Sequence, residues 1–274
     1  MRSLSTRRTR SLLIVFVLSG LLVLADLLSR SSLHFTELAS GWLLLALCLL
    51  LTLFNLRKKL AFLPLGSAAL WLQIHIYAGL FTVVVFLFHI GWRIPNGVFE
   101  GILGFLFVGV SASGVMGLFM SRTFSHRLTL RGEPVLYETI PVRQKLIQEE
   151  VEKLVLNCLA ETSSTAIPEF YARKLKGFLE TRRNLWLHLV QSTRPIHALK
   201  LEIRAQTRYL NEAEREYMRK IAERVQLKDT LDYQFALQSA LKYWLFVHIP
   251  LTYALLTFAA VHVVLVYAFL GGMR

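Results

Sequence analysis

Two apolar segments that each carry two histidines constrain this chain more than any other feature. The first contains His75 and His89, and the second contains His248 and His262, so the histidines are fourteen residues apart in both. Fourteen helical residues turn about 1400°, roughly 40° short of four turns, and rise about 21 Å. Each segment therefore predicts a helix with two imidazoles on nearly the same face, one near each edge of a hydrocarbon layer roughly 30 Å thick.

Long apolar runs predict an all-α integral membrane protein. They are long enough to span a bilayer and lie at about 11–29, 41–56, 68–91, 99–120 and 243–270. The first run begins after a basic stretch, so it is either a retained anchor, which its length favours, or a cleaved signal peptide. We expect a bundle of about five transmembrane helices.

A polar stretch separates the fourth apolar run from the fifth. It predicts three regions: spans one to four in 1–121, a helical insertion in 122–242, and span five in 243–274. Within the insertion, Pro141 and Pro168 are each expected to open a helix. Asn211 with Glu214 resembles a capping box at the start of a third helix, which we expect to end near Gln226.

The net charge of +13 has a topological explanation. Basic residues gather before span one, after span two and after span four, whereas the segments after spans one and three carry only Arg30 and Arg93. The positive-inside rule therefore predicts a cytoplasmic N-terminus and a cytoplasmic insertion, in what we expect to be a bacterial inner membrane. This pattern accounts for the basicity without nucleic acid, and no nucleic-acid recognition motif is present.

The four histidines predict metal ligation, because ionisable groups inside a span are costly and histidine is a common axial ligand of haem iron. Spans three and five run in the same direction, so His75 faces the level of His248, and His89 faces that of His262. We expect two non-covalent b haems, each with two histidine ligands, since no CxxCH motif is present. Arg93, expected one turn beyond His89, is a candidate for an outer-haem propionate. Another intramembrane metal or plain interhelical hydrogen bonding are the alternatives.

These two histidine pairs resemble those of the membrane cytochrome b superfamily, which includes the b subunits of quinol–cytochrome c complexes, ferric-reductase-like domains and cytochromes b561. The resemblance covers spans three to five and not the insertion, and it implies a four-helix dihaem core. The flavin and nicotinamide module of ferric reductases is absent, as is the quinol-site motif Pro-Glu-Trp-Tyr of the respiratory subunits.

Three functions follow from these observations. The first is a b-type cytochrome that carries electrons across the bilayer between partner donor and acceptor proteins or quinone, as a subunit of an oxidoreductase complex rather than a complete enzyme. The second is a self-contained quinol- or metal-reducing oxidoreductase. The third is a non-redox membrane scaffold in which the histidines bond helices together.

Overall fold

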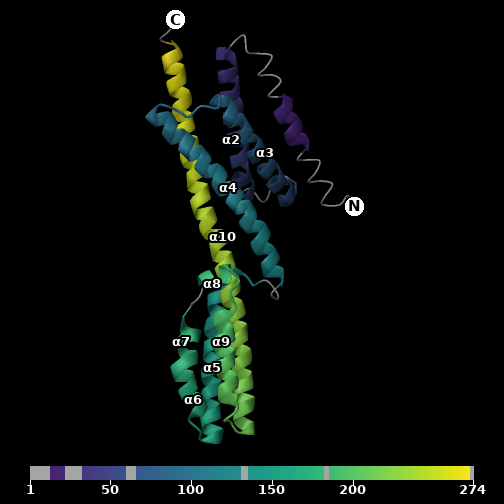
Figure 1. Ribbon diagram of the computed structural model, residues 1–274, viewed down its shortest axis with the longest axis vertical. Helices are drawn as coiled ribbons and strands as arrows, with labels where there is room; N and C mark the ends of the chain where they lie inside the picture. The colour runs from purple at the N-terminus through teal and green to yellow at the C-terminus, as the bar shows by residue number, and fades with distance from the viewer. Residues whose placement is uncertain (1–12, 22–32, 60–65, 131–134, 182–184, 272–274) are drawn as a thin grey trace. The chain divides into compact units, whose positions relative to one another are not determined.

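The computed structural model describes the chain except residues 1–12, 22–32, 60–65, 131–134, 182–184 and 272–274 (Figure 1). All regular structure in the described part is helical, and no strand occurs there. The chain divides into two compact units. The membrane unit comprises Met1–Leu118 and Trp244–Arg274, and the polar unit comprises Phe119–Tyr243.

Four helices in the described part are long and apolar enough to cross a membrane. They are α2 (Leu33–Lys59), α3 (Ala68–His89), α4 (Val98–Leu130) and α10 (Glu212–Gly271). The expectation of an all-α membrane protein is confirmed at this level. The predicted first span falls largely outside the described residues, where only 13–21 are seen, as helix.

Sequence signals at both ends explain the bounds of α3. The Ser67 side chain accepts a hydrogen bond from the Leu70 N–H, which caps the N-terminus. At the other end, Gly91 has a φ of 59°, a left-handed conformation that glycine adopts without strain. The Trp92 N–H then donates to the Leu87 carbonyl at 3.1 Å, and the Gly91 N–H donates to that of Phe88 at 3.0 Å. This pair of bonds is a Schellman motif, so α3 stops at His89.

The end of α3 corrects the expectation that placed Arg93 on the helical face of His89. Because the chain leaves the helix through Gly91 and Trp92, Arg93 follows a turn and its side chain is exposed. The sequence pattern missed this turn because apolar residues continue beyond His89, whereas the glycine decides the backbone conformation.

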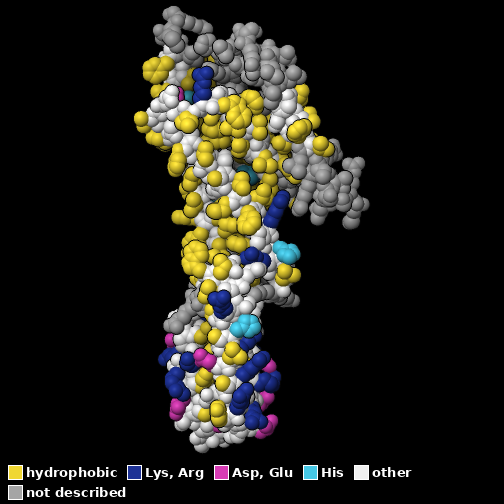
Figure 2. Space-filling model, in the orientation of Figure 1, with side chains coloured by type: hydrophobic (Ala, Val, Ile, Leu, Met, Phe, Trp, Pro, Cys, Tyr) yellow, Lys and Arg dark blue, Asp and Glu magenta, His cyan; other side chains and the backbone are white. Residues whose placement is uncertain are grey.

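The polar unit is a bundle of helices around a main apolar core, with a second, smaller apolar cluster that includes Phe124, Tyr233 and Leu237. Its helices include α5 (Ile140–Thr162), α6 (Ala166–Phe170), the π-helical turn Tyr171–Leu175, α7 (Lys176–Glu180), α8 (Leu185–Leu189) and α9 (Arg194–Thr207). On the face drawn in Figure 2, charged side chains of both signs gather on this unit, while those visible on the membrane unit are mostly hydrophobic. The fully buried core residues include Ile140, Val151, Cys158, Leu175, Ile221 and Val225.

The predicted capping box is confirmed in full. The Asn211 N–H donates to the Glu214 carboxylate at 2.8 Å, and the Glu214 N–H donates to the Asn211 side-chain oxygen at 2.8 Å. The helix that follows does not end near Gln226, however, because α10 continues to Gly271. No glycine or proline interrupts residues 212–249, so nothing local stops the helix there. Helix α9 was not predicted, although Pro195 stands in its first turn.

Candidate functional site

The histidines predicted to form the outer pair lie close together in the membrane unit. The ring centroids of His89 on α3 and His262 on α10 are 6.5 Å apart, with ring planes at 89°. Two imidazoles that share one metal ion, at about 2.0–2.1 Å per bond, have their centroids roughly 6 Å apart. The spacing of this pair therefore fits a single metal ion held between the two rings.

The inner histidines are also brought together. His75 on α3 lies close enough to His248 on α10 to interact with it electrostatically. Both rings are half-buried within the membrane unit. The side chains between the two levels are packed tightly: Thr82 and Val85 of α3, Phe107 of α4 and Leu255 of α10 are 1–6% exposed. The four histidines are thus arranged as two pairs at the two ends of a packed layer.

Three of the four imidazoles are oriented by a hydrogen bond at Nδ1. His89 Nδ1 lies 3.2 Å from the Ser40 hydroxyl, and His75 Nδ1 lies 3.1 Å from the Leu51 carbonyl oxygen. His248 Nδ1 lies 3.1 Å from the Ser113 hydroxyl. A histidine that ligates a metal through Nε2 usually donates its other N–H to such an oxygen, which sets the tautomer and aims the ring.

Small residues allow neighbouring helices to approach the imidazoles. A Cβ added to Gly41 would lie 3.0 Å from Cε1 of His89, and one added to Gly114 would lie 3.8 Å from Cε1 of His248. On α4, Ser113 and Gly114 lie next to His248, whereas a Cβ added to Gly101 would meet no atom within 4 Å.

Aromatic side chains complete both levels. The Trp244 ring stacks on His248 with centroids 5.3 Å apart, and its indole N–H donates to the Ser113 carbonyl at 2.8 Å. At the other level, the Phe99 ring lies parallel to that of His262, with centroids 6.3 Å apart. One aromatic ring therefore lies against a histidine at each level.

The sequence interpretation missed the contribution of α2. Ser40 and Gly41 form a small pair inside an apolar run, and this pair is a signal that could have been read. The Leu51 carbonyl could not have been found, because every residue has a carbonyl and only the packing of α2 on α3 selects this one. Helix α2 contacts His89 through Ser40 and His75 through the Leu51 carbonyl, eleven residues later.

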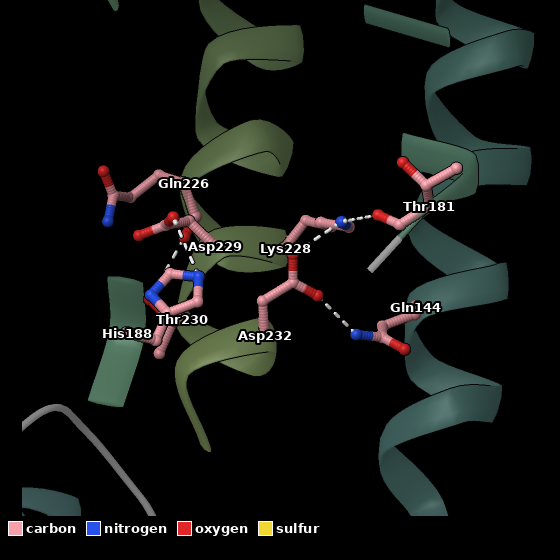
Figure 3. A network of polar contacts seen from close by, with 8 residues as sticks. All are labelled: Gln144, Thr181, His188, Gln226, Lys228, Asp229, Thr230 and Asp232. Carbon is pink, nitrogen blue, oxygen red and sulfur yellow. Dashed lines mark hydrogen bonds and ion pairs between the residues drawn. The ribbon is translucent and has the colours of Figure 1, made fainter. Parts of the chain in front are cut away.

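A second polar cluster is buried in the polar unit (Figure 3). The Lys228 ammonium donates to Asp232 at 2.6 Å and to the Thr181 carbonyl at 2.7 Å, and it lies 4.5 Å from the centre of the Phe178 ring. Gln144 donates to the other Asp232 oxygen at 2.6 Å. These contacts tie α5 and the end of α7 to α10. The cluster is a structural ion pair inside the bundle.

His188 belongs to the same region, where Nε2 lies 3.9 Å from an Asp229 oxygen. It is buried, as expected for a core residue rather than a ligand. No group of three or more histidine, cysteine or acidic side chains in the described residues could hold a metal ion.

Comparison with protein-family models, with curated proteins and with solved structures gives no match. The case for a particular function therefore stands on the four histidines and on the residues that surround them.

Proposed function

We propose that the chain is a b-type dihaem cytochrome that carries electrons across the membrane between partner redox proteins or quinone. The observation that carries this proposal is the pairing of His89 with His262 at a centroid separation of 6.5 Å, a distance suited to one iron between two imidazoles. His75 precedes His89 by fourteen residues, and His248 precedes His262 by the same number. The two pairs are therefore separated by the same rise along both helices.

Each residue around the pairs has a role in this proposal. His75 and His248 hold the inner haem, and His89 and His262 hold the outer one. Ser113, Ser40 and the Leu51 carbonyl accept hydrogen bonds from Nδ1 and so keep Nε2 directed toward the iron. When bound, each haem supplies a one-electron redox centre.

A haem held by two histidines would favour electron transfer over binding of a gas or substrate at the metal. The bilayer core keeps water from the ligands, and Arg93 is proposed to meet a propionate of the outer haem. On the charge pattern of the loops, we place the polar unit on the cytoplasmic side of a bacterial inner membrane.

A reduced-minus-oxidised spectrum of the purified chain tests the proposal, together with a haem-to-protein ratio. The expected result is two haems per chain, low-spin and extractable with acid acetone. A ratio near one, or haem that resists acid acetone, would refute the dihaem proposal, and a colourless protein with haem supplied during expression would refute haem binding altogether.

A scaffold function is the second candidate, because the same Nδ1 bonds join helices without any metal. His89 and His75 bond α3 to α2, and His248 bonds α10 to α4. If this is their whole role, glutamine at these positions should preserve folding and partner binding, and the spectrum should show no haem.

A further inference from the structure

The two histidine levels of the membrane unit differ in the hydrogen bonds that hold their imidazoles. At the inner level, both rings have an oxygen atom close to Nδ1. The Leu51 carbonyl oxygen lies 3.1 Å from Nδ1 of His75, and the Ser113 hydroxyl lies 3.1 Å from Nδ1 of His248. A carbonyl can only accept, so its contact requires a proton on Nδ1 of His75 and leaves the lone pair on Nε2.

The contact between Ser113 and His248 is held in place by a third residue. The Ser113 carbonyl accepts a hydrogen bond from the Trp244 indole N–H at 2.8 Å. The Trp244 ring in turn stacks on the His248 ring, with centroids 5.3 Å apart. The serine, the indole and the imidazole therefore position one another, and the hydroxyl is kept beside Nδ1.

The outer level lacks one of these contacts. His89 has the Ser40 hydroxyl 3.2 Å from Nδ1. His262 makes no hydrogen bond with any residue that the structure describes, and its printed neighbours are rings. Phe99 lies parallel to it with centroids 6.3 Å apart, and His89 lies at 6.5 Å. One imidazole of the outer pair is thus without an acceptor for its Nδ1–H in this part of the chain.

This difference affects the redox potential of a haem bound at each level. An imidazole that donates its Nδ1–H to an oxygen becomes a stronger electron donor at Nε2. Stronger donation stabilises ferric iron relative to ferrous iron and so lowers the potential. Because all four ligands are histidines, ligand type does not distinguish the two levels, and the hydrogen bonds do. Two such bonds at the inner level favour a lower potential there.

Charged residues beyond the two levels have a weaker effect. Arg93 follows the outer level and is exposed, and its positive charge would raise the outer potential. Arg57 would raise the inner potential, but it lies six residues beyond Leu51 on α2, or about 9 Å along the helix axis. Salt screens such charges over a Debye length of about 8–10 Å. The bonds at Nδ1 act directly on the ligands and therefore set the order of the potentials.

We propose that His75 and His248 form a low-potential haem centre and that His89 and His262 form a high-potential one. Electrons pass spontaneously from the lower to the higher potential, so they enter at the inner level and leave at the outer level. Each transfer oxidises ferrous iron at the inner level and reduces ferric iron at the outer level, and no bond forms or breaks. A one-electron reductant on the cytoplasmic side supplies the electron. This inference rests on the proposed dihaem function and adds the direction of electron flow.

A potentiometric titration of the full chain, purified with both haems, tests the order. The wild type should titrate in two one-electron steps. Ser113→Ala removes an acceptor from the inner level alone, so it should shift the lower step to a higher potential and leave the higher step unchanged. Ser40→Ala is the matched variant, and it should raise the higher step alone. The order should persist at about 1 M salt, where the Debye length falls to about 3 Å.

His262→Ala assigns the two steps without changing either serine. It keeps both inner ligands, so the haem that remains should titrate near the lower step of the wild type. A remaining haem that titrates near the higher step overturns the inference. So does a shift of the higher step in Ser113→Ala, a single step in the wild type, or unchanged potentials in both serine variants. In each of these cases the wild type still binds two haems, whereas a haem-free wild type refutes the proposed function itself.

Discussion

At the scale of single residues, the hydrogen bonds at Nδ1 of the histidines can be tested directly by substitution. In the proposed haem site, Nε2 ligates iron, so the Nδ1–H of His248 donates to the Ser113 hydroxyl, 3.1 Å away. Such a bond makes the imidazole a stronger donor to the metal. It therefore stabilises the oxidised iron relative to the reduced iron.

Replacing Ser113 with alanine should raise the midpoint potential of one haem and leave the other unchanged. The lost hydrogen bond weakens electron donation from His248, so the reduced state becomes relatively more stable. Potentiometric titration of the purified variant measures this shift. Ser111→Ala, two residues earlier on the same helix, is the control and should keep both potentials. A lower potential in Ser113→Ala would contradict the assigned direction of the hydrogen bond.

Gly117 is a position where packing forbids any side chain. A Cβ added there would lie 1.8 Å from Cζ2 of Trp244, well inside van der Waals contact. Gly117→Ala should force the indole away from His248 and from its bond to the Ser113 carbonyl. We expect a loss of about 1–3 kcal/mol in stability, as for other overpacked sites.

A thermal unfolding assay in detergent measures this loss. Gly101→Ala is the control on the same helix, because a Cβ there meets no atom within 4 Å. Equal melting temperatures for the two variants would mean that Trp244 does not pack on α4 as described.

At the scale of elements, α10 carries a buried ion pair whose titration links stability to pH. Burial raises the pKa of Asp232 to about 6, and the nearby Lys228 ammonium partly opposes this rise. The folded chain therefore holds a proton on Asp232 up to about pH 6, whereas the unfolded chain releases it near the ordinary value of 3.8. Between these values the folded state binds more protons, so stability falls as pH increases.

As the pH rises from about 4 to about 6, amides of the polar unit should progressively lose protection against hydrogen exchange. Amide hydrogen exchange of residues 228–237 in the full chain, corrected for the intrinsic effect of pH on exchange, measures it. Asp232→Asn cannot titrate and should lack this component of the slope. If the slopes of the wild type and the variant are the same, Asp232 does not titrate in this range.

Local capping signals located the ends of helices more reliably than a change in composition did. The Asn211 and Glu214 box set the start of α10, and Gly91 set the end of α3. The expected end near Gln226 was wrong because a change from polar to apolar composition does not interrupt backbone hydrogen bonding. Pro250 does not end the helix either, because α10 continues through it to Gly271.

At the scale of the whole molecule, the arrangement of α3 and α10 predicts which histidines share a haem. His75→Ala and His248→Ala should remove or perturb one haem, and His89→Ala and His262→Ala should affect the other. Partners on different levels would be separated by about 21 Å along the helix axis, too far for one iron.

The double variant His75→Ala/His248→Ala should resemble either single variant, because a second ligand lost from a broken site costs little more. Haem content and redox titration distinguish the two centres. If His75→Ala and His262→Ala silence the same haem, the parallel arrangement of the two helices is wrong.

Some of these features follow from the sequence alone. The four histidines, their fourteen-residue spacing and the long apolar runs are local properties, and the helical period turns them into faces and depths without tertiary information. The expected partners His89 and His262 could be named for the same reason, since topology follows from the order of the spans.

Other features depend on contacts between residues far apart in the chain. Ser40 and the Leu51 carbonyl reach the histidines of α3 only because α2 packs against it, and Gly117 is restricted only because Trp244 of α10 occupies the adjacent space. The place of α8 likewise depends on the bond from Arg127 of α4 to the Leu189 carbonyl, a contact between residues 62 positions apart. Sequence periodicity specifies the face that a helix buries, whereas the partner of each atom on that face is decided by packing.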